Sequence, residues 1–417
     1  MTTDQRPPWV MAEPKEVEQG EEKSSPVGLV ILVALFAFLW YAAGFRAFLV
    51  VMGLLVMIFL HELGHFMTAR WTGMKATQFF IGMGPRLWSF RRGETEYGIR
   101  ALPIGAFVRI IGMNNLDPHP PEDRDRAYMY KSYPRRMLVI TAGSAMHFIQ
   151  AFILFIVLAS VIGAPDSSKW TIAEISRLET GETPSVEAGL VPGETISAVD
   201  GVDTTDFVVL RDYVRERAGE TVELEVTGEN GVRVVETTLA ERPLSDGTNA
   251  GFLGVAPDFE RTAQNPWVGV EEFGTAFWRS LTIIPQFLSP GTFTNLVSLM
   301  GQGSAEVDIL SDEAANRPVS MVGAVRLAGN AEADPAVPVV MLAYINIFVG
   351  IFNLLPLLPL DGGHAAIATY ERIRSRRDKP YHMDVAKLLP LTYAVVGFLA
   401  FLMISTVWLD IARPIVQ

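Results

Sequence analysis

The chain has 417 residues, with 34 Lys or Arg against 46 Asp or Glu, so its formal net charge is −12. Its hydrophobic content of 49% and charged content of 19% exclude a disordered protein. The acidic balance argues against a nucleic-acid partner. The sequence has no cysteine, which excludes a disulfide scaffold, a thiolate zinc finger, an iron–sulfur site and a cysteine nucleophile.

Four long apolar runs predict a protein that crosses a membrane. They cover about 27–60, 137–163, 338–360 and 388–409, and each reaches the roughly 20 helical residues that a hydrocarbon core requires. The first run is too long for one crossing, because at about 1.5 Å per residue it would reach ~50 Å against a core of ~30 Å. We therefore expect it to divide at Ala43-Gly44, with one strongly tilted helix as the alternative.

The charges between these runs predict the orientation of the chain. Segment 67–136 carries twelve Lys/Arg and six acids, and segment 371–387 carries six Lys/Arg and three acids. Segment 166–272 has eight Lys/Arg against twenty-two Asp/Glu. Because Lys and Arg are enriched in short cytoplasmic loops, we expect the two basic segments on the cytoplasmic side of the membrane. We expect the acidic segment on the opposite, outer side.

The acidic outer segment has the pattern of a small α+β domain. Its alternating stretches predict strands, and its helical spacing before Gly219 predicts one helix. Glu229-Asn230-Gly231 is a hairpin turn signal between the last two strands. The expected strands are 170–175, 195–199, 222–226 and 232–238, and the expected helix is 207–218.

Part of this segment resembles bacterial PDZ domains. The similarity lies in Ala188-Gly189-Leu190, Pro192-Gly193-Glu194 and Val199-Asp200-Gly201. It implies a domain that receives a peptide by adding a strand to a sheet edge. A packed module without a peptide ligand, acting as a spacer or size filter, is the alternative.

The stretch 273–300 after this domain is apolar and aromatic, but Pro285 and Pro290 interrupt it. It therefore favours a pair of amphipathic surface helices over further membrane spans. A face buried against the outer domain is an equally good interpretation.

The sequence His61-Glu62-Leu63-Gly64-His65 predicts a metal site. Positions i and i+4 of a helix share one face, so both imidazoles can reach one zinc ion. Glu62 is placed to take a proton from the attacking water. Histidine and glutamate at the inner end of an apolar span are costly unless they function.

A catalytic zinc site needs a third protein ligand and an open position. Trp71 stands where a metzincin would carry its third histidine, which excludes that class. Glu94 and Glu96 are available but lie in a basic turn. Asp361 is the alternative, since by the orientation above it lies at the cytoplasmic end of its run, at the same depth as the two histidines.

These motifs resemble the site-2 protease family, the intramembrane zinc metalloproteases of the M50 type. The resemblance covers about 50–410 and is closest to the bacterial PDZ-containing branch that cleaves membrane-bound anti-sigma factors. It rests on the histidine motif and on 353–363, and it extends to 80–85, 92–97 and 102–108. By resemblance, one Zn²⁺ per chain is bound by His61, His65 and Asp361, Glu62 is the general base, and Asn353 holds or polarises the substrate carbonyl.

The chain departs from the family pattern in the second span. Gly143-Ser144-Ala145-Met146-His147 stands where the family often has Gly-Pro-x-x-Asn. A histidine buried in a span is a functional candidate, although His147 and also His364 are equally compatible with packing or with support of the site. His119 and His382 lie in expected loops and need no role.

A transmembrane helix hides its peptide bonds in its own hydrogen bonds, so a protease must unwind it first. Strands are expected at 87–90 and 97–99 around Arg92-Gly93-Glu94, with a further strand at 102–110. The resemblance implies a membrane-dipping sheet whose edge holds the unwound substrate as an added strand.

The sequence thus predicts an intramembrane zinc metalloprotease in the inner (cytoplasmic) membrane, with its zinc site toward the cytoplasm and its PDZ-like domain outside. The expected partners are the lipid bilayer, a single-span substrate such as an anti-sigma factor, and an upstream site-1 protease that trims the same substrate. Two rivals are a non-catalytic receptor that binds partners through the PDZ-like domain and a zinc transporter, for which only His147 would supply an additional ligand.

The expected fold is a polytopic α-helical membrane protein with four core transmembrane helices, a further N-terminal one, a membrane-associated β-hairpin or sheet and an inserted α+β PDZ domain. In chain order its parts are an acidic disordered tail (1–26), the additional helix (27–43), a helix with the zinc motif (46–66), a cytoplasmic and membrane-dipping β segment (67–136), a helix (137–163), the PDZ-like domain (166–260), the amphipathic region (261–335), a helix with the third ligand (338–360), a basic loop (371–387) and a last helix (388–409).

Overall fold

A computed structural model describes most of the chain. The described residues are 26–113, 115, 120–175, 183–229, 231–243, 249–287, 289–304, 307–308, 317–330, 336–376 and 381–416. The chain divides into two compact units, unit 1 (Met1–Ile156 and Gly269–Gln417) and unit 2 (Val157–Val268). The expected tail 1–26 lies outside the described residues apart from Pro26, and so do His119 and Asn230.

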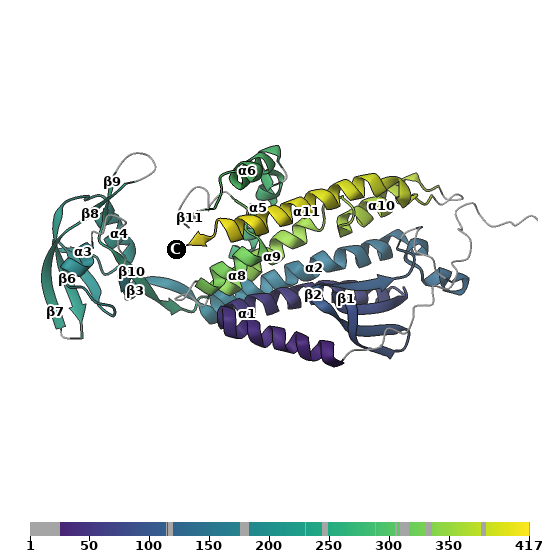
Figure 1. Ribbon diagram of the computed structural model, residues 1–417, viewed down its shortest axis with the longest axis horizontal. Helices are drawn as coiled ribbons and strands as arrows, with labels where there is room; N and C mark the ends of the chain where they lie inside the picture. Colours follow the sequence, from purple (N-terminus) through teal and green to yellow (C-terminus); the bar gives the residue numbers. More distant parts are fainter. Residues whose placement is uncertain are drawn as a thin grey trace, which may run out of the picture. The chain divides into compact units, whose positions relative to one another are not determined.

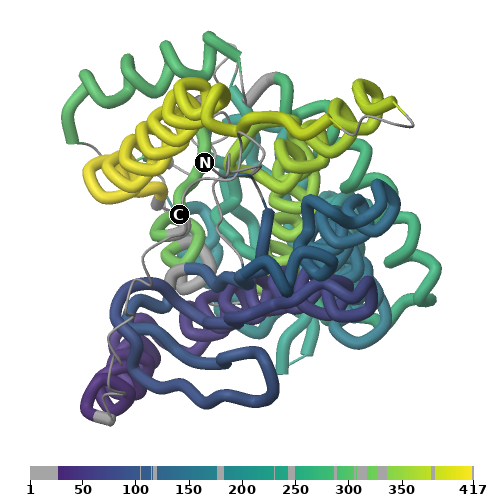
Figure 2. The backbone as a smooth tube through the Cα atoms, turned by 90° about the vertical axis from the view of Figure 1, so that its right-hand side faces the viewer, coloured from purple at the N-terminus to yellow at the C-terminus, as the bar shows by residue number. Residues whose placement is uncertain are grey.

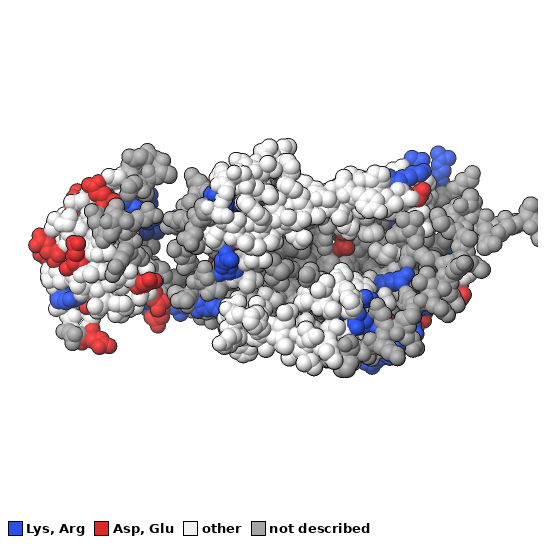
Figure 3. Space-filling view, in the orientation of Figure 1, with Lys and Arg blue, Asp and Glu red and all other residues white. Residues whose placement is uncertain are grey.

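Three helices of the described chain are long and apolar enough to cross a membrane. They are α1 (Pro26–Trp71), α2 (Tyr133–Val157) with a π-helical turn at Leu158–Ile162, and α11 (Leu389–Ala412). Figure 3 shows mostly uncharged residues over the middle of the helical part of unit 1, with Lys and Arg toward its ends. One of these ends carries α10 (Asp361–Arg374) and the hairpin of β1 (Ala76–Arg92) and β2 (Thr95–Ile110). Such a surface fits the hydrocarbon region of a bilayer better than water.

Helix α1 is broken where the sequence predicted a division. Gly44 has φ 81° and ψ 169°, so it does not continue the helix. This positive φ is readily adopted by glycine and rarely by other residues. The bend separates an exposed first half from the half that carries the histidine motif (Figure 1).

The run 338–360 is not one helix, in contrast to the sequence prediction. Helix α9 ends at Phe352, and α10 (Asp361–Arg374) begins after an irregular segment. Pro356 and Pro359 lie in that segment and cannot donate to a helical ladder. Helix α9 (Val337–Phe352) is therefore a shorter apolar helix than the other three.

Two glycines follow Asp361 directly. Gly362 and Gly363 lie inside the first turn of α10 and do not break it. A Cβ at Gly363 would lie 2.6 Å from the backbone nitrogen of Leu358, and one at Gly362 would meet the backbone of Leu354 and Leu355. The pair therefore allows the irregular segment to pack directly on the start of α10. Residues 371–374, which were expected to lie in the loop 371–387, belong to helix α10.

Helices α1, α2 and α9 pack on one another at glycine positions. A Cβ at Gly64 of α1 would lie 2.8 Å from the carbonyl oxygen of Ala142 on α2. A Cβ at Gly350 of α9 would lie 2.7 Å from the ring of Phe148 on α2, and Gly53 of α1 meets Leu342 of α9. Small residues at such interfaces let helix backbones approach closely in a membrane.

The segment between α1 and α2 forms the expected β structure. Strands β1 (Ala76–Arg92) and β2 (Thr95–Ile110) pair antiparallel, and each bends so that the hairpin folds onto itself. Phe79 therefore pairs with both Tyr97 and Val108, and 106–110 becomes one edge of the folded sheet. Figures 1 and 2 both place the hairpin beside α1.

The expected pair of helices follows unit 2. Helix α5 (Pro266–Phe287) packs on α2 through Phe273 and Phe277, whose rings contact Phe152 and Phe148 at centroid distances of 5.5 Å. Helix α6 (Pro290–Met300) packs on α11. The remaining elements in the described part of unit 1 are short: η1 (Pro121–Arg126), η2 (Tyr128–Tyr130), β11 (Val307–Asp308), α8 (Met321–Asn330), η4 (Val385–Leu388) and β12 (Ile415–Val416).

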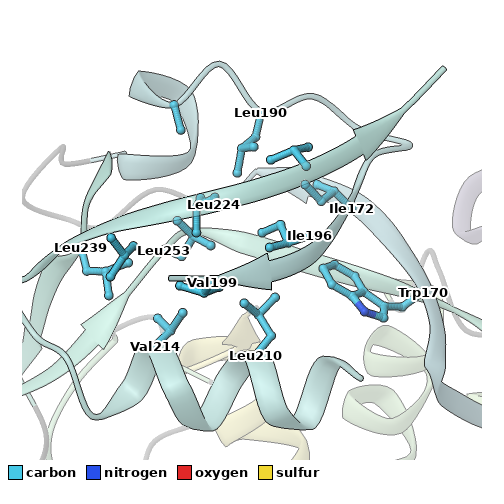
Figure 4. Close-up of a cluster of buried hydrophobic side chains, with 13 residues drawn as sticks. Trp170, Ile172, Leu190, Ile196, Val199, Leu210, Val214, Leu224, Leu239 and Leu253 are labelled. Atoms are coloured by element: carbon cyan, nitrogen blue, oxygen red, sulfur yellow. The ribbon is translucent and has the colours of Figure 1, made fainter. Parts of the chain in front are cut away.

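Unit 2 is an α+β structure with its own core. A four-stranded sheet has the order β5-β4-β6-β7, and β10-β3 and β8-β9 form two smaller sheets. Figure 4 shows Leu210 and Val214 of α4 directed toward Val199 and Ile196 of the sheet. The elements are β3 (Ala164–Ile175), α3 (Pro184–Glu187), β4 (Thr195–Val199), β5 (Val202–Asp203), α4 (Phe207–Arg215), β6 (Thr221–Gly228), β7 (Gly231–Thr238), β8 (Ala240–Pro243), β9 (Asn249–Phe252) and β10 (Val255–Thr262).

The local pattern of the outer segment predicted these elements well. The strand 195–199 has its predicted bounds, and β6 and β7 form the predicted hairpin. Helix α4 begins after Asp206, whose side chain accepts a hydrogen bond from the Val208 amide, and it ends at Arg215, three residues before the predicted end. The strands β8, β9 and β10 have no counterpart in the sequence prediction.

Candidate metal centre

The two histidines and the aspartate named by the sequence meet in unit 1. His61 and His65 lie on one face of α1, and Asp361 is the first residue of α10. The Nε2 atoms of the two imidazoles are 3.2 Å apart. Asp361 Oδ2 lies 3.5 Å from His61 Nε2 and 3.2 Å from His65 Nε2. Each residue thus offers one ligand atom at the corner of a small triangle.

This triangle fits zinc. Ligand atoms about 2.0–2.1 Å from a tetrahedral zinc ion are about 3.3–3.4 Å apart, and the three observed edges are 3.2, 3.2 and 3.5 Å. Two neutral imidazoles and one carboxylate are borderline ligands of the kind that zinc prefers. Both histidines are 8% exposed, so the two imidazoles are largely shielded from bulk water.

A backbone carbonyl orients one of the imidazoles. His65 Nδ1 lies 2.7 Å from the carbonyl oxygen of Val139 on α2. A carbonyl oxygen only accepts, so Nδ1 carries the proton and Nε2 keeps its lone pair for a metal. No residue pattern marks this contact in the sequence, because any residue at position 139 supplies the same carbonyl.

Gly143 of α2 leaves the space that the ligand atoms occupy. A Cβ at this position would lie 2.7 Å from His61 Nδ1 and would contact His65 Nε2, the ligand atom itself. The absence of a side chain here keeps the space between the two rings open. The sequence marked Gly143 only through the family pattern, and not through any chemistry of its own.

Glu62 faces the same space and is held by the β hairpin. Its Oε2 accepts a hydrogen bond of 3.0 Å from the backbone amide of Val108, and its Oε1 lies 3.9 Å from His61 Nε2. Val108 belongs to the sheet edge 106–110. The carboxylate is therefore fixed between the ligand triangle and a strand edge.

Asn353 lies beside the triangle at the end of α9. Its Nδ2 donates to Asp361 Oδ2 over 3.3 Å and lies 3.5 Å from His61 Nε2. An open cavity of about 310 Å³ adjoins the site. Its described lining comprises Ile58, His61, Glu62, His147, Val349, Asn353, Pro359 and Asp361.

His147 lines this cavity but is not one of the three clustered ligands. Its ring centroid lies 4.9 Å from that of His61, and its Nδ1 lies 3.0 Å from Asn346 Oδ1. Asn346 in turn donates from Nδ2 to the carbonyl oxygen of Leu342. Asn346 was not among the residues predicted from the sequence. An amide side chain within an apolar run is unusual, and it could have marked this position as a candidate.

The other candidate ligands lie apart from the triangle. Glu94 forms a two-point ion pair with Arg126, whose hydrogen bonds hold the pKa of this carboxyl below its usual value. Glu96 accepts hydrogen bonds from Arg86 and Ser89 at 2.6 and 2.8 Å. These hydrogen bonds satisfy both carboxylates, so neither glutamate needs a metal ion as a partner.

A buried ion pair joins the two helices that frame the site. Arg136 Nη1 of α2 donates to Glu371 Oε2 of α10 over 2.7 Å, and both side chains are less than 10% exposed. Removing one partner of such a pair is costly, because the other charge stays buried. The pair therefore fixes α10, and with it Asp361, against the helix that carries Gly143. His364 lies one turn after Asp361 and lines a small cavity beside this pair.

Two imidazoles and a carboxylate around an open cavity, with a glutamate beside them, define the site of a zinc-dependent hydrolase at the end of an apolar helix. The profile of peptidase family M50 matches residues 48–397. The chain therefore belongs to peptidase family M50, the site-2 protease family, and is a zinc metalloprotease.

Curated relatives agree over nearly the whole length. The chain is similar to zinc metalloprotease Rip1 of Mycolicibacterium smegmatis, with 34% identity over 413 residues, covering 89% of this chain and 98% of the relative. Rip1 of Mycobacterium tuberculosis strain H37Rv is 33% identical over 396 residues, covering 87% and 96%. A putative zinc metalloprotease of Clostridium acetobutylicum is 28% identical over 365 residues, covering 86% and 95%. These findings favour the enzyme over the receptor and transporter hypotheses.

Proposed function

We propose that this metalloprotease hydrolyses a peptide bond within or beside the transmembrane helix of single-span membrane proteins. The observation that carries the proposal is the position of the His61–His65–Asp361 triangle, which lies between apolar helices and beside a strand edge. Helices that expose apolar side chains are unfavourable in water but stable in a bilayer, so a site between them favours a substrate that lies in the membrane.

The proposed roles follow from the contacts. His61, His65 and Asp361 hold the zinc ion, which when bound supplies a Lewis acid for the scissile carbonyl. Glu62 takes the proton of the attacking water and passes it to the leaving amine. Asn353 has an amide 3.3 Å from Asp361, and it orients the substrate carbonyl with this donor group.

The hairpin is the proposed holder of the unwound substrate. The Val108 amide donates to Glu62, so the edge 106–110 lies within hydrogen-bond reach of the general base. A substrate segment added along this edge would have its backbone polar groups satisfied outside a helix. That arrangement would also bring its carbonyl groups to the site.

The proposed biological context is regulated intramembrane proteolysis. Unit 2 is proposed to be a PDZ domain that binds or gates substrate already cut by a site-1 protease, and an anti-sigma factor is the proposed substrate. Support comes from the Ala188-Gly189-Leu190 and Pro192-Gly193-Glu194 stretches and from the separate core of unit 2. The proposed setting is the cytoplasmic membrane, crossed by four core helices and the first half of α1.

The test of this function is substrate capture followed by cleavage. The Glu62→Gln protein is expected to retain uncleaved single-span proteins in the membrane, and these are identified by mass spectrometry. Each captured protein is then reconstituted with the wild-type enzyme in liposomes. The expected product termini lie within or beside the transmembrane segment, and products that end only in soluble loops would contradict the proposal.

The proposed orientation gives a prediction that the cysteine-free sequence makes easy to check. Glu236→Cys in unit 2 and Arg372→Cys in α10 each place one thiol at an exposed position. A membrane-impermeant maleimide is expected to label Glu236→Cys in intact spheroplasts and Arg372→Cys only after permeabilisation. The parent protein serves as the unlabelled control, and the reverse pattern would overturn the orientation.

A further inference from the structure

Unit 2 contains a cavity of about 330 Å³ between α4 and the segment 250–255. Its inner surface is apolar and includes Leu210, Val214 and Leu253, which also belong to the core of the unit. Its basic lining consists of Arg211, Arg215 and Arg242. We call this cavity the basic groove.

The charge of the basic groove is opposite to that of its surroundings. Segment 166–272 carries twenty-two acids and eight Lys/Arg, yet three of those eight basic residues line the groove. The described lining contains no acidic residue. Figure 3 shows acidic residues spread over the visible face of unit 2. Because opposite charges attract, three arginines in a lining without acids favour the binding of carboxylates.

Two elements bring the three arginines together. Arg211 and Arg215 are four residues apart on α4, so they share one face of the helix. Arg242 comes from β8, where its neighbour Glu241 accepts a hydrogen bond from Asn249. Since neighbouring strand residues point to opposite faces, Arg242 is directed away from that acid.

The existing partner of Arg211 does not close the groove. Its Nε and Nη2 donate to Asp212 at 2.9 and 2.8 Å, and both side chains are more than half exposed. Exposed ion pairs contribute little because water and salt compete for the charges. An incoming carboxylate can therefore replace Asp212.

The backbone beside the groove is suited to an extended ligand. Ser185 donates from its amide to the Leu253 carbonyl and from its hydroxyl to the Gly254 carbonyl, each over 3.0 Å. In a trans peptide the next N–H points opposite to the carbonyl, so the amides of Gly254 and Val255 point away from Ser185. Strand β10, which begins at Val255, pairs with β3 along one edge, and within the described sheets its other edge is open.

We propose that the basic groove binds an acidic, extended peptide whose apolar side chains enter the cavity while its carboxylates pair with Arg211, Arg215 and Arg242. This inference rests on the proposed function in one respect, namely that the natural ligand is the outer segment of a membrane-bound substrate. The groove thus selects substrates by their negative charge. The metal site selects them by whether their backbone can reach it as an extended segment.

The test measures binding to the full-length Glu62→Gln protein in nanodiscs, so that cleavage does not interfere. Three fluorescent octapeptides alternate valine with glutamate, glutamine or lysine. The glutamate peptide is expected to bind about tenfold more tightly than the glutamine peptide at low salt, with the lysine peptide weakest. This preference is expected to shrink as salt is raised.

A matched pair of charge reversals locates the effect. Arg215→Glu is expected to remove the preference for the glutamate peptide. Lys169→Glu makes the same change of net charge at an exposed position that does not line the groove, and it is expected to keep the affinity within about twofold. Equal binding of the three peptides, or equal losses in the two variants, would overturn the inference.

This result is separable from the proposed function. If transmembrane helices are cleaved but the three peptides bind equally, whatever their charge, only the groove inference is overturned. Charge-selective binding without any transmembrane cleavage would overturn the proposed protease function alone.

Discussion

Glu62→Gln is expected to abolish cleavage of a single-span reporter while the protein keeps its zinc and its place in the membrane. The glutamine amide oxygen can still accept the hydrogen bond that Glu62 receives from Val108, which is 3.0 Å long in the native protein. The substituted side chain cannot take a proton from water. Losing a general base of this kind costs about 10²–10⁴-fold in rate, which single-turnover cleavage in liposomes measures.

The matched control is Glu94→Gln. Glu94 makes an ion pair with the partly exposed Arg126 away from the metal centre, and such surface pairs contribute about 0–1 kcal/mol. Its variant is expected to cleave at the wild-type rate. Full activity in Glu62→Gln with normal zinc content would mean that another group serves as the base, and His147, which lines the same cavity, would then be the next residue to substitute.

The sequence could predict the ligand cluster because the chemistry of its residues is local. His61 and His65 share a helix face at a spacing of four, and a carboxylate such as Asp361 is costly at the end of an apolar run unless it functions. The choice of Asp361 over Glu94 rested on the resemblance to the site-2 protease family. The orientation predicted from the basic loops agreed with it, because it placed Asp361 at the depth of the two histidines. The structure then brings the three ligand atoms within 4.8 Å of one another.

The supporting shell could not be predicted because it consists of backbone groups and empty space. The Val139 carbonyl orients His65, and the Val108 amide holds Glu62. Neither contact depends on which side chain stands at those positions, so no residue pattern encodes it. The space beside Gly143 is likewise a property of the packing of α2 on α1, and not of the glycine alone.

Fold prediction succeeded where the pattern was long and failed where the chain turns sharply. The break at Gly44 followed from a simple length argument. By contrast, hydropathy treated 338–360 as one helix, although Pro356 and Pro359 end it. The self-folded hairpin was only partly predicted, because its second register joins residues that are distant along each strand.

Gly143→Ala is expected to lose zinc although position 143 contributes no ligand atom. The added methyl would contact His65 Nε2 and lie 2.7 Å from His61 Nδ1, so at least one imidazole must turn away from the triangle. Losing an orienting contact at a metal site costs about 10–100-fold in affinity. We expect a loss at the upper end of that range, together with loss of cleavage, measured by competition with a zinc chelator and by metal analysis of the purified protein.

Gly397→Ala is the control that makes this prediction specific. Gly397 lies within α11, and a Cβ at this position has no described atom within 4 Å. The same substitution here adds the same methyl group and the same gain in helix propensity, about 0.5–1 kcal/mol. It is expected to leave zinc binding and cleavage unchanged. If both variants retained zinc equally, the imidazoles would have room to move around a methyl group, and the open space at Gly143 would not be what sets the geometry of the ligands.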